Sequence, residues 1–383
     1  DRGLNLNAGP YVNDLITTLN AASDITSWGE SYEAASMVSY IGRLNYAYKG
    51  KYLFTTTFRS DGSSRFGVNK RFASFPSLAV AWKISDENFI QDIHFIDEMK
   101  LRASWGKSGN NNIGNYSHLP IVTLGQYVFN NTINPDLAWE ESAQVDVGLE
   151  MSVLTNRLNF TVDYYKRRTN NMLMNDLIPA ITGFNSQLVN KGLVQNSGWE
   201  IGINTKPLIG KFRWTANFNI AFNSNKVIKT NENGDRILAG NSDGRPSHVS
   251  IVGQPVGQFF GFILDGVYTQ KEIEDPTVAK FPGAVAGNPK YRDIDGDGII
   301  TELLDFTVIG NPHPKFVFGF SNTFGYRNWD LMVNINGRYG GKVMNGMRQT
   351  TDNLQGYFNI GKEWVNRWIN AENPGDGIHA GRP

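Results

Sequence analysis

Apolar and polar residues alternate along many short stretches of this chain, which is the pattern of a β-strand with one apolar and one polar face. In residues 211–223, for example, Phe212, Phe218 and Phe222 alternate with Arg, Thr and Asn. Successive side chains of a strand point to opposite faces, so this segment would place its apolar residues on one face and its polar residues on the other. We expect about eleven or twelve strands, and the clearest cover residues 38–49, 51–59, 78–84, 100–105, 144–153, 158–165, 199–205, 211–223, 315–324 and 330–338.

The length of these strands separates a membrane barrel from a soluble sandwich. Several approach the roughly 9–11 residues that a tilted strand needs to cross a bilayer, whereas strands of soluble sheets usually have about 5–6. Their polar face is rich in Arg, Asp, Glu and Asn, and their apolar face is rich in aromatic residues. The sequence therefore predicts an all-β fold, a transmembrane antiparallel β-barrel that is only partly contained in the chain.

The connections between strands alternate between short and long. Residues 154–157 and 207–210 are short joins, and Asn156 is suited to a tight turn. Long stretches rich in Gly and Asn cover residues 107–119, 231–248, 270–304 and 344–383, and we expect them to be external loops. Trp364 and Trp368 are four residues apart, which predicts a helix with both rings on one face.

Composition narrows the classes of function. The 36 basic and 36 acidic residues balance, so the net charge gives no reason to expect a nucleic-acid partner. The chain has no Cys, which removes disulfides, thiolate catalysis and Cys-ligated zinc. Its 40 Gly residues favour strands joined by turns. The chain starts at Asp1 without a charged and apolar leader, so we expect any signal peptide to lie outside it.

The predicted strands and turns also carry a series of short motifs in a fixed order. They are SYIGRLNY at 39–46, KYL at 51–53, RSDGSSRFG at 59–67, FPS at 75–77 with Trp82, KLRASWG at 100–106 with Gly109 and Asn110, NPDLAWE at 134–140, DYY at 163–165 with Thr169, Gly183 with Phe184, GQPVG at 253–257 with Gly261, Asp265 and Gly266, and VIGNP at 308–312 with Pro314. Through these motifs nearly the whole chain resembles the SusC/RagA family of TonB-dependent outer-membrane transporters from Bacteroidetes-type bacteria.

The resemblance implies a barrel of about 22 strands that encloses an N-terminal plug. Residues 1–383 would then be the middle and later part of one barrel domain, with the plug, the TonB-contacting segment and the closing C-terminal strands outside this chain. It further implies an outer-membrane location in lipid, a SusD-like surface lipoprotein as a lid, energy from the TonB complex, and nutrient uptake with oligosaccharides (glycans) or peptides as cargo.

The sharpest local motif is an Asp-rich loop with carboxylates at alternate positions, followed by Gly298. This spacing resembles a calcium-binding loop, in which oxygen atoms converge on one point. The twelfth position is Leu304, so the last acid comes one residue late and the loop would have to bulge. The alternative is a turn with solvated carboxylates. The candidate ligands of a structural Ca²⁺ are Asp293, Asp295, Asp297, Thr301 and Asp305, and no other cofactor is expected.

Aromatic residues in the turn-rich segments are candidates for stacking on cargo, and arginines on the polar face are candidates for guiding it. The aromatic candidates are Phe259, Phe260, Tyr268, Trp364 and Trp368, and the arginines are Arg43, Arg59, Arg102, Arg157 and Arg213. The alternative is that these aromatics belong to the interfacial girdle or pack a loop against a lid, and that the arginines pair with the plug.

No catalytic group stands out. The five His residues lack metal-ligand spacing, and Glu140 and Glu141 are strand neighbours that point to opposite faces, so they cannot flank one glycosidic bond. The sequence therefore predicts a transporter and not an enzyme. Two alternatives stay open: a secreted or cell-surface β-rich glycan-binding module, which would be soluble without detergent, and a hydrolase whose groups come from distant loops.

Overall fold

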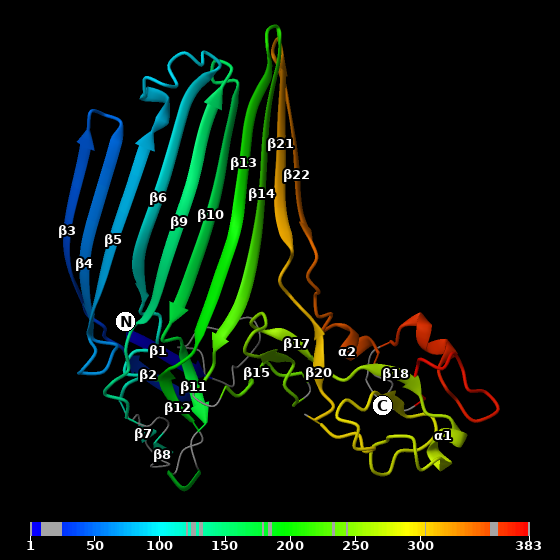
Figure 1. Cartoon of the computed structure of the whole chain (residues 1–383). Coiled ribbons are helices and arrows are strands. Elements are labelled where there is room, and N and C mark those ends of the chain that lie inside the picture. The colour runs from blue at the N-terminus through cyan, green and yellow to red at the C-terminus, as the bar shows by residue number, and fades with distance from the viewer. Residues whose placement is uncertain are drawn as a thin grey trace. The chain divides into compact units, whose positions relative to one another are not determined.

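A computed structural model describes residues 2–8, 25–119, 122–123, 128–129, 133–177, 180–182, 186–231, 234–242, 244–302, 304–352 and 359–381. Gly183 and Phe184 of the sequence motifs lie outside these ranges, as do parts of the predicted long loops. The described chain is dominated by one sheet of ten strands in the order β22-β21-β14-β13-β10-β9-β6-β5-β4-β3, drawn in Figure 1. The ten strands lie in the sheet in the order in which they follow one another along the chain, and each pairs with the next.

The ten strands of the main sheet coincide with the ten segments predicted from alternation. They are β3 (Met37–Tyr48), β4 (Tyr52–Ser63), β5 (Phe72–Lys83), β6 (Ile96–Asn110), β9 (Glu140–Val153), β10 (Leu158–Asn170), β13 (Leu193–Ile209), β14 (Phe212–Lys229), β21 (Phe316–Tyr326) and β22 (Trp329–Tyr339). Their lengths of 11–18 residues equal or exceed those of the predicted segments. The prediction of long strands in one antiparallel sheet is confirmed, although the count of eleven or twelve was slightly high for the described part of the sheet.

The remaining elements are short and lie in the connections. Strands β1 (Arg2–Ala8) and β2 (Ile25–Tyr32) pair with each other, as do β7 (Val122–Thr123) with β8 (Val128–Phe129), β11 (Leu173–Leu177) with β12 (Ser186–Asn190), and β18 (Leu264–Val267) with β19 (Pro289–Tyr291). A further sheet holds β15 (Ile237–Ala239), β16 (His248–Ser250), β17 (Gln258–Gly261) and β20 (Thr307–Gly310). The helical pieces are η2 (Ile84–Asp86), η3 (Ala180–Thr182), α1 (Gln270–Glu274), α2 (Arg348–Thr351) and η4 (Lys362–Asn366). Among the described residues, no helix has the length and apolar character needed to cross a membrane.

The short turns form where the sequence predicted them. Between β9 and β10, Leu154, Thr155 and Asn156 all have positive φ, and the backbone of Asn156 donates to the carboxylate of Asp97. The join between β13 and β14 is shorter than predicted, because β13 continues through an irregularity after Thr205 as far as Ile209. The predicted helix at Trp364 and Trp368 is wrong in extent: η4 ends at Asn366, so the two rings do not share a helical face.

The chain divides into two compact units, which are described separately. Unit 1 comprises Asp1–Val80, Ser104–Gln144 and Thr169–Lys191, and unit 2 comprises Ala81–Ala103, Val145–Arg168 and Gly192–Pro383. The core of unit 1 consists of Phe66, Phe75, Leu137 and Trp139, with Leu173 and Leu188 packed against it. In unit 2 a smaller core lies in the connection between β14 and β21, where Val249, Phe260 and Phe306 meet.

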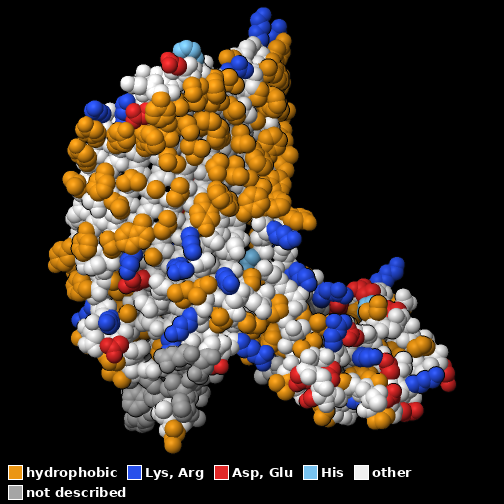
Figure 2. All heavy atoms as spheres, viewed as in Figure 1, with side chains coloured by type: hydrophobic (Ala, Val, Ile, Leu, Met, Phe, Trp, Pro, Cys, Tyr) orange, Lys and Arg blue, Asp and Glu red, His pale blue; other side chains and the backbone are white. Residues whose placement is uncertain are grey.

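The register of the unit 2 strands gives the sheet two chemically distinct faces. Trp199 lies opposite Phe222, Phe218 lies opposite Phe320, and Phe320 lies opposite Ile335, so apolar residues share one face across four strands. We call this the apolar face and the other the polar face. Positions of the polar face in these strands include Glu200, Asn204, Asn217, Asn219, Asn223, Ser321, Thr323, Asn334 and Asn336. Figure 2 shows hydrophobic side chains massed over the strands.

Candidate functional site: the polar face and its pocket

The polar face of unit 2 carries a ladder of ion pairs across β6, β9 and β10. Arg102 lies between two carboxylates, with its Nε 2.9 Å from Glu150 and its Nη2 2.7 Å from Asp163. Lys100 adds a second cation 2.5 Å from Glu150. Gly148 leaves room for the ladder, since a Cβ at this position would collide with the Asp163 carboxylate. Charges on this face are therefore matched within the wall itself.

On β13 and β14 the hydrogen bonds of the polar face are made mainly by asparagine amides, in place of the ion pairs of β6, β9 and β10. Asn225 donates from Nδ2 to the Oδ1 of Asn196 at 2.8 Å, and Asn204 bonds to Asn217 in the same way. The hydroxyl of Tyr165 on β10 donates to Asn223 at 2.9 Å. Each amide offers two donor hydrogens and one acceptor oxygen. This part of the face presents a strongly hydrogen-bonding surface, in which Glu200 of β13 is a charged group among the amides.

A pocket of about 360 Å³ lies in unit 1, where β4, β5 and β6 reach the end of the sheet that joins the long connections. Its charged lining residues are Arg59, Asp61 and Lys107. Arg59 is paired with the buried Asp61 at 2.7 Å, and Lys107 lies 3.2 Å from Glu141. The other lining residues are Met37, Thr57, Phe75, Ser77, Ser108, Gly109, Asn111 and Trp139.

The aromatic part of the pocket wall is held by tight packing. The ring of Trp139 is tilted against Phe66 at a centroid distance of 4.8 Å and meets Phe75 edge-on at 5.5 Å, while its indole Nε1 donates to the carbonyl of Arg71. Gly109 permits this packing, since a Cβ there would strike the rings of Phe75 and Trp139. The pocket thus combines both charges, hydroxyl and amide groups, and rigid aromatic walls, which are the groups that recognise polar organic molecules.

Of the predicted arginines, Arg59 lines this pocket, Arg102 belongs to the ion-pair ladder, and Arg157 and Arg213 lie near the short turns at the other end of β10 and β14. Arg157 donates to the backbone oxygens of Lys206 and Pro207, and Arg213 lies 3.7 Å from Asp330. Arg43 lies on β3, opposite Thr57. The residues that sequence reasoning missed in the pocket are Asp61, Lys107 and Trp139. Asp61 lies in the RSDGSSRFG motif and Trp139 in the NPDLAWE motif, so membership of these motifs was the feature of the sequence that could have identified them.

The five predicted aromatic residues lie in the loop region of unit 2 and do not form one surface. Phe260 and Tyr268 are buried: Phe260 packs edge-on against Phe306, and the Tyr268 hydroxyl donates to the carbonyl of Ala279. Phe259 lies beside His248 at a ring distance of 5.2 Å. These contacts describe loop packing, and stacking on cargo stays a prediction for this set.

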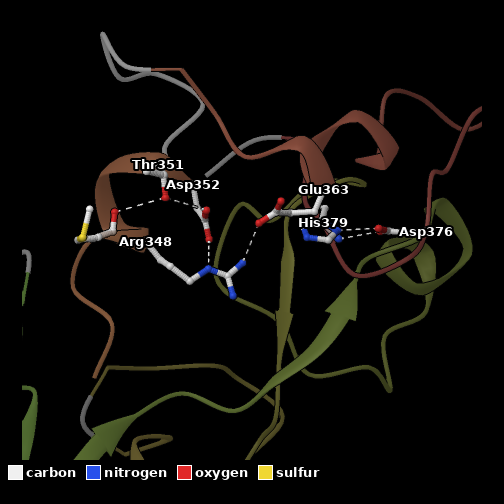
Figure 3. A network of polar contacts seen from close by, with 7 residues as sticks. Arg348, Thr351, Asp352, Glu363, Asp376 and His379 are labelled. Atoms are coloured by element: carbon white, nitrogen blue, oxygen red, sulfur yellow. Dashed lines mark hydrogen bonds and ion pairs between the residues drawn. The ribbon is translucent and has the colours of Figure 1, made fainter. Parts of the chain in front are cut away.

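Trp364 lies against a polar cluster near the C-terminal end of the chain, and Figure 3 shows Arg348, Asp352, Glu363, Asp376 and His379 of that cluster. Trp364 meets the ring of His379 edge-on at 5.0 Å, and His379 is hydrogen-bonded to Asp376 at 2.6 Å. Backbone N–H donors from His379 and Ile378, with the His379 side chain, lower the pKa of Asp376 to about 2. In the same cluster Arg348 is paired with Asp352 at 2.8 Å and reaches Glu363. Trp368 packs against Gly287, where no Cβ could fit.

The Asp-rich loop brings together three of its five predicted ligands. Carboxylate oxygens of Asp293, Asp295 and Asp297 lie within 4.8 Å of one another. Asp305 is instead fully buried, and its two oxygens accept from the backbone N–H groups of Ile294 and Thr301. Desolvation raises the pKa of Asp295, and repulsion from the neighbouring carboxylates adds to the rise. The geometry suits a hard cation such as Ca²⁺, with Asp305 shaping the loop from inside.

Comparison with known proteins agrees with this architecture. The family described as TonB dependent receptor-like, beta-barrel matches residues 2–368. The chain is 36% identical over 359 residues to TonB-dependent receptor P26 of Formosa agariphila, covering 90% of this chain and 36% of that protein. It is 34% identical to TonB-dependent receptor SusC of Bacteroides thetaiotaomicron, covering 78% of this chain and 31% of the relative. The chain thus spans about a third of the length of these relatives.

Among solved structures, the chain is similar to the RagAB peptide transporter. The TM-score is 0.80 at 25% sequence identity, and the match covers 97% of this chain and 41% of that one. A second RagAB structure, a peptide importer in a closed state, matches with a TM-score of 0.76 and 26% identity. The resemblance noted from the motifs is confirmed. The chain belongs to the TonB-dependent receptor-like β-barrel family, in its SusC/RagA group, and is part of the wall of an outer-membrane protein.

Proposed function

We propose that the protein containing this chain imports polar nutrients, oligosaccharides or peptides, across the outer membrane. The observation that carries the proposal is the two-faced sheet: an aromatic and aliphatic face that suits hydrocarbon, and a hydrogen-bonding face that suits a wet interior. The relatives named TonB-dependent receptor support a TonB-driven mechanism. The similarity to RagAB, a peptide transporter, supports a polar organic cargo such as a peptide.

The unit 1 pocket is proposed as one point of contact with cargo on the way into the barrel. It lies at the end of the sheet with the long connections, which in outer-membrane barrels face the cell exterior. Arg59 and Lys107 can bind carboxylate or hydroxyl oxygens, while Asp61 can accept from ammonium or hydroxyl groups. By analogy with the RagAB assembly, a SusD-like lipoprotein would cover this end.

The import proposal is tested in a strain that lacks the full-length gene. Growth on single glycans and single peptides should fail for one cargo class and return with the wild-type gene. A protein recovered as a soluble secreted module, without detergent and with growth unaffected, would overturn the proposal. Incubating the purified full-length protein with the same glycans tests the hydrolase alternative, and no turnover is expected.

The pocket is tested by filling it. Ser108→Phe should place a ring in the pocket while leaving the Arg59–Asp61 and Lys107–Glu141 pairs intact. We expect the KM for uptake to rise about tenfold, which corresponds to about 1.4 kcal/mol of lost binding. Ser224→Phe, which adds the same ring on the apolar face of β14, is the matched control and should leave uptake unchanged. Equal uptake by both variants would remove the pocket from the pathway.

We further propose that the Asp-rich loop binds Ca²⁺ through Asp293, Asp295 and Asp297. The convergence of their oxygens supports this, and so does the hydroxyl of Thr301, which is buried and has no hydrogen-bond partner among the described residues. Titration calorimetry of the full-length protein with millimolar Ca²⁺ should release heat, and Asp295→Asn should abolish it. Absence of heat from the wild-type protein would reject the site.

A further inference from the structure

The apolar face of unit 2 ends in a continuous row of aromatic rings near the long connections. Tyr164 of β10 contacts Trp199 of β13 at a ring distance of 5.0 Å, and Trp199 is the cross-strand partner of Phe222 on β14. Phe222 contacts Phe316 at 5.7 Å, and Phe316 contacts Tyr339 at 5.3 Å. The row crosses five neighbouring strands. Aromatic residues in this arrangement mark the boundary between hydrocarbon and lipid headgroups.

A second set of aromatic rings lies toward the short turns, and its distance from the first row gives the height of the apolar band. Trp214 stacks on Phe324 at 5.9 Å, and Phe212 lies 6.1 Å from the same ring. Phe212 and Phe222 are ten residues apart on β14 (222 − 212 = 10), which is about 33 Å along a strand. A strand tilt of about 35–45° reduces this to about 25 Å across the membrane, the height of the apolar band in outer-membrane barrels.

Three cations lie beyond the aromatic row on the same face of the sheet. Lys166 and Arg168 follow Tyr164 on β10 at two and four residues, and Lys226 follows Phe222 on β14 at four residues. Arg168 donates from Nε to the Oε1 of Gln195 at 3.1 Å, and Gln195 is the cross-strand partner of Lys226. Gln195 therefore links Arg168 to the position of Lys226. Lys166 lies two residues before Arg168 on the same face of β10, so the three cations are about 7–13 Å past the aromatic row along the strands. Figure 2 shows Lys and Arg side chains in this part of the strands.

The apolar face of β10 and of the four strands from β13 to β22 in the main sheet offers these cations no acidic partner. From Tyr164 to Arg168 on β10 and along β13, β14, β21 and β22, its positions hold no Asp or Glu. Among the described residues, Lys166, Arg168 and Lys226 make no ion pair, and all three are exposed. The polar face of the same unit pairs Lys100 and Arg102 with carboxylates. Three uncompensated cations at headgroup depth are complementary to anionic headgroups.

We propose that Lys166, Arg168 and Lys226 form a binding site for a phosphate-bearing lipid of the outer leaflet. The acyl chains would lie on the aliphatic and aromatic rows of β10, β13 and β14, and the headgroup phosphate would accept hydrogen bonds from the three cations. Gln195 holds Arg168 toward Lys226 and so keeps the site assembled. This surface is on the outside of the barrel wall, so its role is separate from the passage of cargo through the interior.

The test uses the full-length protein in phosphatidylcholine nanodiscs with and without phosphatidylglycerol, and native mass spectrometry to count retained lipids. The variant combines Lys166→Gln, Arg168→Gln and Lys226→Gln. Because each cation near an anionic surface contributes about a fivefold change in affinity, binding of phosphatidylglycerol should weaken about 100-fold. Repeating the titration with a phosphorylated glycolipid and its dephosphorylated form should show that the phosphate is required.

The matched control removes exposed cations from the opposite end of the same strands. Lys211→Gln and Arg327→Gln lie at the β13–β14 and β21–β22 turns and should leave lipid binding unchanged. Heat-modifiable migration on a gel verifies that every variant is folded, and nutrient uptake is measured in parallel, so a failure of import is distinguished from a failure of lipid binding. Equal lipid retention by the triple variant and the wild type, or equal loss in the control, would overturn the proposal.

Discussion

A lysine in place of Phe218 is the most direct probe of which face of the sheet meets lipid. Phe218 lies on the apolar face of β14, four residues from Trp214 on one side and four from Phe222 on the other. These distances are each about 13 Å along the strand, so Phe218 sits midway between the two aromatic boundaries. Its ring meets Phe320 edge-on at a centroid distance of 6.3 Å.

The cost of this substitution follows from that position. A lysine at the bilayer midplane of a barrel costs about 2–4 kcal/mol, and loss of an aromatic pair adds about 0.5–1.5 kcal/mol. Phe218→Lys should therefore lower the free energy of unfolding by about 3–5 kcal/mol. Ser224→Lys places the same charge on the same face beyond Phe222, at headgroup depth, where the expected cost is about 0–1 kcal/mol.

The assay is equilibrium unfolding of the full-length protein in lipid vesicles, followed by tryptophan fluorescence and heat-modifiable migration. Asn219→Lys, next to Phe218 but on the polar face, should also cost little. If Phe218→Lys were no more costly than Ser224→Lys and Asn219→Lys, the apolar face would not be in hydrocarbon, and the assignment of interior and exterior would be wrong.

Other substitutions test the remaining parts of the structure. Gly148→Val should cost about 1–3 kcal/mol by forcing Asp163 and Arg102 apart, while Gly42→Val, at a position with open space, should cost little in the same unfolding assay. Asp305→Ala should increase hydrogen exchange across residues 293–305, because the N–H groups of Ile294 and Thr301 lose their acceptor, whereas Asp295→Ala should change it less. The folded-state pKa of Asp376 is depressed to about 2, so its stabilising effect is present above its ordinary pKa near 3.9 and is lost as the pH falls toward 2. The protection of residues 359–381 against hydrogen exchange, taken relative to the intrinsic rate at each pH, should therefore fall between about pH 4 and pH 2, and Asp376→Asn should remove that dependence.

The sequence identified the main sheet because the lipid-facing rows impose a strict two-residue period. Where the strands leave that environment the pattern fades, and most strands extend beyond their predicted boundaries at one or both ends. On β14 the alternation stops at Asn223, yet the strand continues through Ser224 and Lys226 to Lys229, since backbone pairing with β13 goes on without an apolar face to mark it. The sequence therefore predicted which segments form strands but not how far each strand extends.

The loop region was less predictable because its contacts join residues far apart in the chain. Phe260 and Tyr268 look like exposed loop aromatics in the sequence, but Phe260 packs on Phe306, and Tyr268 reaches Ala279. Trp368 is positioned by Gly287, more than eighty residues earlier. The three Asp residues of the Asp-rich loop were predicted correctly as a cluster, since their convergence depends on local spacing, whereas the inward position of Asp305 depends on how the loop folds back.

Under the proposed import function, the distribution of polar groups bears on how cargo is selected. The charges of Lys100 and Arg102 are balanced within the wall by those of Glu150 and Asp163, so these residues present little unbalanced charge to a passing molecule. The amides of β13 and β14 can donate to or accept from the peptide groups of a peptide and the hydroxyl groups of a sugar alike. Neither region can therefore discriminate strongly between the two cargo classes. Discrimination should instead come from sites with fixed shape and charge, such as the pocket of Arg59, Asp61 and Trp139, and exchanging that pocket between relatives should change cargo preference more than exchanging the strands of the wall.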